Sequence, residues 1–165
     1  MDDPGKIAEH TLDSEELANL IRAAVAHGNT ICFNAPGRSM APFIHSEDII
    51  FVSPVAKGTI RTGDVLAFVH PETGRVLAHR VVRIADGRFF SKGDNVTAEG
   101  DGWISYEDVL GRVDRVQRDA KDHHLGLGPE KFVVALLSRC NILVPLLNFL
   151  RGIKWSFKGL FSARG

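Results

Sequence analysis

The sequence has few of the features that define several common protein classes. Its 165 residues include only two cysteines, Cys32 and Cys140, far apart and in no metal-binding or redox spacing. The two cysteines could be free thiols or could form one bridge, and a reducing compartment is the simpler interpretation. The formal net charge is zero, which argues against binding of nucleic acid by the whole molecule. The length suits one domain with one core and small appendages.

Several ligand-binding signatures are also missing. The sequence has no Gly-rich phosphate-binding loop followed by Lys and Ser or Thr, and no dinucleotide fingerprint. His123 and His124 are adjacent, so on a strand they would face opposite ways, and the other histidines have no matching ligand spacing. The N-terminus lacks the basic start and apolar core of a secretory signal. We therefore expect no metal, no cofactor and no nucleic-acid partner.

Basic residues are scarce at the N-terminal end of the chain, and acidic residues are absent from the C-terminal end. Residues 1–30 carry six acids and two bases, whereas residues 131–165 carry six bases and no acid. The C-terminal stretch is also strongly apolar, which suits the surface of an anionic membrane. A clean spanning helix is not expected, because Arg139 would cost about 2.5–3.5 kcal/mol at the bilayer centre and Pro145 would kink or split the helix. We expect two short helices; the alternative is a core-covering helix followed by a disordered end.

An amphipathic helix is predicted near the N-terminus. Asp13 can cap it, with Glu16 as capping-box partner, and Gly28 ends it. Its apolar residues fall on one helical stripe. They are Leu17, Leu20, Ile21, Ala24 and Val25. The helix is far too short and too polar to span a membrane.

From residue 30 to about residue 117 the pattern changes to short β-rich runs. The expected strands are 30–34, 48–53, 65–69, 75–85, 88–91 and 109–117. Asp86-Gly87 between two of them is a strong hairpin signal, and no helices alternate with the strands, so a parallel sheet is disfavoured. The sequence predicts a mainly β domain, with a coiled antiparallel sheet or partial barrel, over 30–128. An acidic tail and the amphipathic helix precede it at 1–29, and an apolar, basic helical tail follows at 129–165.

Four short segments of the β region carry candidate chemistry. They are GRSMAP at 37–42, IRTGDVLAF at 60–68, AHRVV at 78–82, and SKGDN at 91–95 followed by Asp101. A constrained turn can fix the hydroxyl of Ser39, although plain turns use the same residues. His79 falls on a partly apolar strand face, where a structural role is common. Beside a hydroxyl, however, its neutral imidazole could accept the serine proton and return it to a leaving amine. Asp94 or Asp101 could orient that imidazole, and Asp94 equally suits a turn.

Together and in this order, the segments resemble signal peptidase I of the archaeal and endoplasmic-reticulum type, within the wider signal peptidase and LexA-like clan. The resemblance covers about residues 30–117. Related members have Lys as the base; here His79 occupies that position, and the neighbouring Arg80 stays protonated and cannot act as a base. The resemblance implies a Ser/His peptidase in which Ser39 attacks the scissile carbonyl and His79 is general base and then acid. Asp101, in preference to Asp94, would orient the imidazole.

The resemblance also implies how a substrate would bind. The backbone N–H of Ser39 would donate to the oxyanion. A peptide or leader-bearing protein would bind extended along a strand edge, with shallow pockets for small side chains. We assign Met40 and Pro42, in the same segment as Ser39, to substrate contact.

Family members usually carry a membrane helix just before the nucleophile, and here only the amphipathic helix 14–27 stands there. We therefore expect a domain on the cytoplasmic side, docked to the membrane by its basic tail. Two alternatives remain. One is a non-catalytic peptide-binding or regulatory module on the same fold. The other is a self-cleaving regulator like LexA, disfavoured because one helix does not make a DNA-reading pair and no Lys occupies the base position.

Overall fold

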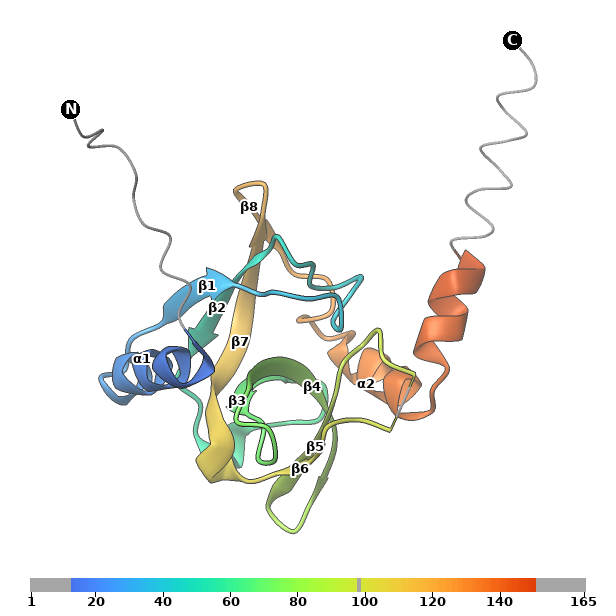
Figure 1. Ribbon diagram of the computed structural model, residues 1–165. Coiled ribbons are helices and arrows are strands. Elements are labelled where there is room, and N and C mark those ends of the chain that lie inside the picture. The colour runs from blue at the N-terminus through green and yellow to red at the C-terminus, as the bar shows by residue number, and fades with distance from the viewer. Residues whose placement is uncertain (1–12, 98, 151–165) are drawn as a thin grey trace, which may run out of the picture.

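Figure 1 shows the computed structural model of the protein, which describes residues 13–97 and 99–150. The elements are α1 (Ser14–Ala26), β1 (Ile31–Asn34), β2 (Ile49–Ser53), β3 (Val65–Val69), β4 (Val76–Ala85), β5 (Arg88–Lys92), β6 (Gly102–Ile104), β7 (Val109–Arg118), β8 (Lys121–His123), α2 (Lys131–Arg139) and the helix Leu143–Leu150. The eight strands form one antiparallel sheet in the order β1-β2-β7-β3-β4-β5-β6, and β8 pairs with β7. Among these strands β1 and β6 do not pair, so the sheet curls without closing. This confirms the predicted mainly β, coiled antiparallel fold.

The predicted N-terminal helix is confirmed as α1. The Asp13 carboxylate accepts from the Glu16 N–H at 2.8 Å, and the Glu16 carboxylate accepts from the Asp13 N–H at 3.1 Å. Two otherwise free N–H groups of the first turn are thereby satisfied. Ala18 and Ile21 are buried, and α1 packs against β1, β4 and β7. The helix thus covers one face of the sheet.

The core consists of two apolar clusters, one on each face of the central strands. In β3, Val65 and Ala67 belong to the cluster under α1, whereas Leu66 and Phe68 belong to the other. Successive side chains of a strand face opposite sides, so a strand buried on both faces is apolar throughout. Complete burial of a side chain such as Phe68, which has no exposed surface, contributes about 1.5–3 kcal/mol. This rigid centre holds β4 and β7 in place on either side of β3.

The hairpin predicted at Asp86-Gly87 is present in the structure. Asp86 and Gly87 join β4 to β5 with φ angles of 49° and 70°, the two left-handed residues that a two-residue hairpin of type I′ requires. Strands β6 and β8 were not predicted. Each is three residues long and contains residues that are poor strand formers, so its pairing partner rather than its own composition determines it.

The C-terminal region forms two short helices, as predicted. They meet at an angle of 109°. The predicted break at Pro145 is wrong: the chain turns earlier, at Asn141, whose φ is 59°. Pro145 instead lies in the first turn of the second helix, where a missing N–H costs no helical hydrogen bond. Within the described residues no single helix is long and apolar enough to cross a membrane; only the bent pair meets that test jointly. The part of the predicted apolar, basic tail that follows position 150 lies outside the described residues.

Candidate active site

The loop that follows β1 carries Ser39 and is fixed on both sides. Gly37 has a φ of 102°, a conformation that side-chain-bearing residues rarely adopt. One residue past Ser39, Met40 is 5% exposed and inserts into the core cluster under α1. The carbonyl oxygen of Ser39 accepts from the Asn95 N–H at 2.7 Å. Core packing and this inter-loop bond therefore hold the serine in one place.

The structure brings Ser39, His79 and Asp101 together in one hydrogen-bonded chain. Ser39 Oγ lies 2.7 Å from His79 Nε2, and His79 Nδ1 lies 2.7 Å from Asp101 Oδ2. His79 comes from β4 and is 7% exposed, and its ring and that of Phe68 form an edge-type contact with centroids 6.4 Å apart. Asp101 stands just before β6, and its backbone N–H donates to Ser91 O at 2.8 Å. A loop, a strand and a second loop thus converge on one imidazole.

The geometry selects one tautomer of His79. A carboxylate only accepts, so Nδ1 carries the proton and donates it to Asp101. Nε2 is then the acceptor of the Ser39 hydroxyl, the arrangement in which an imidazole can remove the hydroxyl proton. Within residues 13–97 and 99–150 the backbone N–H of Ser39 donates to no protein acceptor, so it is free to donate to a bound oxygen.

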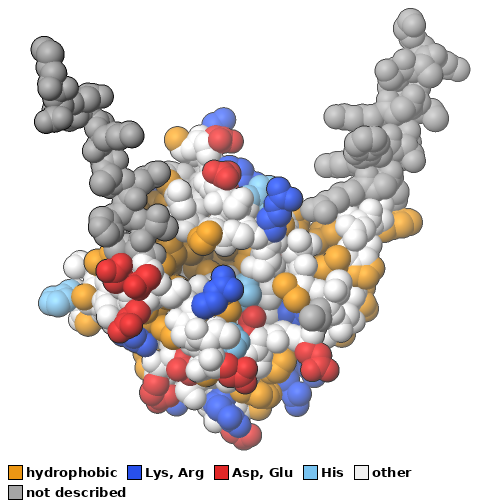
Figure 2. All heavy atoms as spheres, in the orientation of Figure 1, with side chains coloured by type: hydrophobic (Ala, Val, Ile, Leu, Met, Phe, Trp, Pro, Cys, Tyr) orange, Lys and Arg blue, Asp and Glu red, His pale blue; other side chains and the backbone are white. Residues whose placement is uncertain are grey.

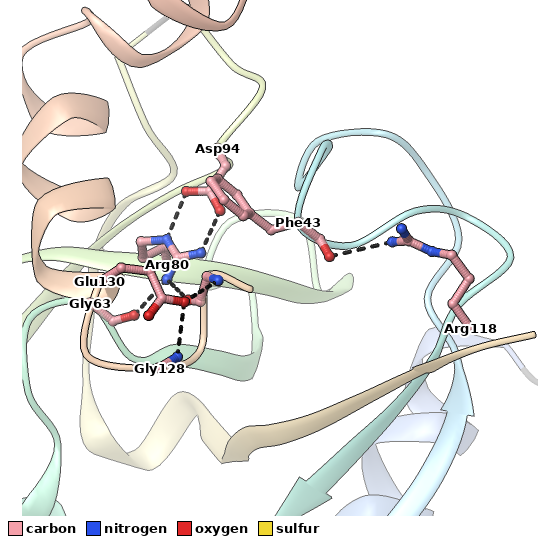
Figure 3. Close-up of polar contacts among 8 residues, drawn as sticks. Phe43, Gly63, Arg80, Asp94, Arg118, Gly128 and Glu130 are labelled. Carbon is pink, nitrogen blue, oxygen red and sulfur yellow. Dashed lines mark hydrogen bonds and ion pairs between the residues drawn. The ribbon is translucent and has the colours of Figure 1, made fainter. Parts of the chain in front are cut away.

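Asp94, the other candidate acid, does not contact His79. It pairs with Arg80, with Nε–Oδ1 at 2.8 Å and Nη2–Oδ2 at 2.7 Å, and both side chains are fully buried. Figure 3 shows the two groups facing each other edge to edge. Burial raises the pKa of Asp94, and the guanidinium of Arg80 opposes that rise. Adjacent residues of a strand point to opposite faces, so an acid on the Arg80 face cannot orient His79.

Arg80 was considered at the sequence level only as a group that cannot be a base, and its structural role was missed. Its Nη1 donates to the carbonyl oxygens of Gly63 and Gly126, each at 2.7 Å. Figure 3 shows how this guanidinium gathers three separate segments around β4. Every donor of a buried guanidinium must find an acceptor. The sequence signal for this ion pair was a basic residue directly after the histidine, together with an aspartate in the Gly-Asp-Asn turn.

Gly93 was also missed as a positioning residue. A Cβ at this position would lie 2.8 Å from the carbonyl oxygen of Ser39 and 3.0 Å from its Cβ. The turn 93–95 therefore approaches the Ser39 loop more closely than any side chain would allow. Because Asp94 belongs to the same turn, its pair with Arg80 joins the β4 strand to the Ser39 loop.

A cavity of about 110 Å³ opens beside Ser39 and His79. Its walls are mostly apolar. They include Leu17 of α1, Phe33 of β1, Met40, Ile50 of β2, and Leu77 and Ala78 of β4. Met40, which we expected to contact substrate, lines this cavity; Pro42, which we also expected there, is not among its lining residues. The cavity has room for one small or medium apolar side chain next to the serine hydroxyl.

Neither cysteine takes part in this site. Cys32 and Cys140 are both exposed and unbridged. In the part of the chain that the structure describes, no cluster of three His, Cys, Asp or Glu side chains could hold a metal ion. Ser39, His79 and Arg75 are the polar side chains that line the cavity, and Asp101 acts on it through its hydrogen bond to His79.

Comparison with known proteins identifies the family. The sequence profile described as Peptidase S24-like matches residues 4–99, more than half of the chain. The chain belongs to this family. The S24-like match contains Ser39, His79 and Asp94 and ends shortly before Asp101.

Curated relatives of this S24-like chain include the signal peptidase complex catalytic subunit SEC11C of human, mouse and dog. Each is 30% identical in an alignment 87 residues long, and the match covers 46% of this chain and 45% of the relative. The chain thus spans less than half the length of these relatives. The family and the relatives together support a function of the peptidase type within the signal peptidase and LexA-like clan.

Proposed function

We propose that this S24-like protein is a serine endopeptidase that cleaves a signal- or leader-peptide-like segment, with Ser39 as nucleophile and His79 as general base. The observation that supports the proposal best is the continuous chain Asp101–His79–Ser39, with both hydrogen bonds at 2.7 Å. A nucleophile, its base and an orienting acid within hydrogen-bond reach are the minimum that acyl transfer by serine requires.

The reaction follows from the positions of the protons. Ser39 Oγ attacks the scissile carbonyl carbon while its proton passes to His79 Nε2. The Asp101 carboxylate stabilises the imidazolium that forms and keeps the ring in its orientation. The negative charge on the carbonyl oxygen is met by the Ser39 N–H. His79 then gives the proton to the leaving amine, and a water molecule hydrolyses the acyl-enzyme by the same path.

The sheet offers a binding edge beside this chain. In the described strands, residues 76–79 of β4 pair only with β3, since pairing with β5 begins at Arg80. The opposite edge of this part of β4 is free, and the cavity beside Ser39 lies between it and β1. An extended peptide can add to such an edge through its backbone and place one side chain in the cavity. The limited volume of the cavity favours a small apolar side chain next to the cut.

The test is cleavage of a mixed synthetic peptide library, with the cleaved bonds identified by mass spectrometry. The wild-type protein should cut, and Ser39→Ala and His79→Ala should not, while far-UV circular dichroism and the unfolding midpoint stay close to wild type. Ser46→Ala, which removes a hydroxyl later in the same loop, is the matched control and should cut normally. Cleavage by Ser39→Ala would refute the mechanism. Peptide binding without cleavage by the wild-type protein would instead favour the non-catalytic module.

A further inference from the structure

The two C-terminal helices expose an unusual amount of apolar surface. We call α2 and the helix Leu143–Leu150 the C-terminal helix pair. Six of its large apolar side chains, and Ile142 in the turn between the two helices, are between 37% and 66% exposed. They are Phe132, Val133, Leu136, Ile142, Leu146, Phe149 and Leu150. In Figure 2 these hydrophobic side chains gather on the right side of the molecule, away from α1. Contiguous exposed apolar surface of this kind marks an interaction site.

The spacing of these residues places them on one stripe of each helix. In α2, positions 132, 133 and 136 are exposed, whereas Val134, Ala135 and Ser138 are buried. In the second helix, Leu146 and Phe149 continue a stripe that begins at position 142 in the preceding turn, whereas Leu143 is buried. One face of each helix therefore packs on the protein, and an apolar face remains without a partner in the described chain.

A cationic pocket lies where the helix pair meets the sheet. Its volume is about 290 Å³, and Arg83, Lys92 and Arg139 line it together with Glu99. Three cationic side chains and one anionic side chain leave the lining with a net charge of +2. Trp103 and Asn141 complete the charged and polar part of the wall.

Lys92 is the most unusual group of this pocket. It is 4% exposed, and its ammonium donates to Ser138 O at 3.2 Å and to the side-chain oxygen of Asn141. In residues 13–97 and 99–150 no carboxylate lies within ion-pair distance of it, so its partners are neutral. Burial lowers the pKa of this ammonium. A buried cation with neutral partners favours an anion in the adjoining cavity.

The bend between the helices argues for a surface position. The N-terminal end of α2 is held by Lys131, whose ammonium lies 2.7 Å from Asp64, and its C-terminal end by Lys92. A straightened pair that spanned a bilayer would lose these bonds and would expose Val134 and Ala135. A pair that keeps its 109° bend retains every one of these contacts and can lie flat at an interface.

We propose that the C-terminal helix pair docks on the surface of an anionic phospholipid bilayer, with a headgroup phosphate held by Arg83, Lys92 and Arg139. The seven apolar side chains enter the boundary between headgroups and acyl chains. The charge of the region complements such a surface, because residues 131–165 contain six basic and no acidic residues. The proposal is independent of the peptidase function, since it uses none of the residues of the candidate active site.

The experiment is flotation of the full-length protein with two kinds of vesicle: phosphatidylcholine alone, and an equal mixture of phosphatidylcholine and phosphatidylglycerol. The double variant Leu146→Ser with Phe149→Ser should lose about tenfold or more in affinity for both kinds. Arg83→Gln with Arg139→Gln should lose about thirtyfold with the anionic vesicles only, because each of the two basic residues contributes about 1 kcal/mol there and about 1.4 kcal/mol is tenfold in affinity. Ile84→Ser and Arg22→Gln, which remove an exposed apolar and an exposed basic side chain elsewhere, are the matched controls and should bind as wild type.

Three outcomes would overturn the proposal. The first is a wild-type protein that does not float with anionic vesicles. The second is wild-type affinity for anionic vesicles in both double variants. The third is a dimer, seen by light scattering, that the Leu146 and Phe149 substitutions dissociate, which would assign the apolar face to a second copy of the chain. Ser39→Ala should float like the wild type, so loss of cleavage and loss of docking can be told apart.

Discussion

Arg80 and Asp94 form a bidentate, fully buried ion pair that joins the strand of His79 to the turn behind Ser39. Neither residue contacts the hydrogen-bonded chain of the candidate site. Their pair nonetheless fixes the distance between β4 and the Ser39 loop, because the Asp94 turn also donates from the Asn95 N–H to Ser39 O. The relative position of serine and histidine thus depends on a polar contact on the far side of the strand.

Asp94→Asn should therefore destabilise the fold strongly. The substitution leaves the Arg80 guanidinium buried without its counter-charge, and breaking such a pair by removing one partner costs about 3–5 kcal/mol. Urea unfolding of the wild-type and variant proteins measures the difference. A loss below about 1 kcal/mol, the range of exposed ion pairs, would show that the pair does not organise the site.

Asp101→Asn should change the stability of the fold little and lower the rate of cleavage strongly. The Asp101 side chain is 16% exposed, so an amide there can be solvated and the free energy of unfolding should change little. An amide that donates to Nδ1 favours the wrong tautomer of His79, and the rate of peptide cleavage should fall by roughly 10⁴. The measurement is kcat with the best library peptide beside the urea midpoint. Cleavage at more than about a tenth of the wild-type rate would exclude Asp101 as the orienting acid.

Gly93→Ala tests the close approach of the two loops. The added Cβ would meet the backbone of Ser39 at 2.8 Å, so the serine must move. A misplacement of about 1 Å can cost about 10²-fold in rate, and overpacking of this kind costs about 1–3 kcal/mol in stability. Gly58→Ala, where a Cβ meets nothing within 4 Å, is the control. Equal kcat for the two alanine variants would contradict the positioning role of the turn.

Much of the fold could be predicted because it depends on local pattern. The six longer strands are apolar runs bounded by turn residues, and the Asp86-Gly87 hairpin follows from two residues that tolerate positive φ. Strands β6 and β8 could not be predicted, because three-residue strands take their conformation from the strands they pair with. The break at Asn141 was missed for a related reason: proline was the conspicuous residue, but its position in the helix decides its effect.

The candidate site was predictable only in part. The order of motifs pointed to Ser39 and His79, yet spacing along the chain could not decide between Asp94 and Asp101. That choice depends on which face of β4 each loop reaches, and hence on the strand register that places Arg80 opposite Lys92. Three-dimensional pairing also determines the close approach of Gly93 to Ser39. Such relations between residues distant in sequence leave no periodic signal.

The pair of Asp48 and Arg118 predicts a pH dependence of stability. Asp48, directly before β2, has a buried carboxylate, and Arg118 is the last residue of β7, with Nε–Oδ1 at 2.7 Å and Nη2–Oδ2 at 2.6 Å. Burial alone would raise the pKa of Asp48, but the hydrogen bonds from Arg118 and from the His45 N–H, together with the charge of Arg118, outweigh it. They hold the pKa below its ordinary 3.8. The native state thus binds the proton of this carboxyl more weakly than the unfolded state does.

The sign of the effect follows from that lowered pKa. The stabilisation from Asp48 is complete above the pKa of the unfolded state, about 3.9, and is lost as the pH falls through the lower pKa of the folded state. Asp48→Asn should cost about 1–3 kcal/mol at neutral pH, and the gap to wild type should close below about pH 4. Urea unfolding across this pH range measures it. Asp122→Asn is the control, because its pair with Arg115 is exposed and 4.0 Å long, and it should cost under about 0.5 kcal/mol at every pH. If the difference in free energy of unfolding between wild type and Asp48→Asn instead widens toward low pH, the pKa of Asp48 is raised and not lowered. The folded protein would then hold this carboxyl in its protonated form.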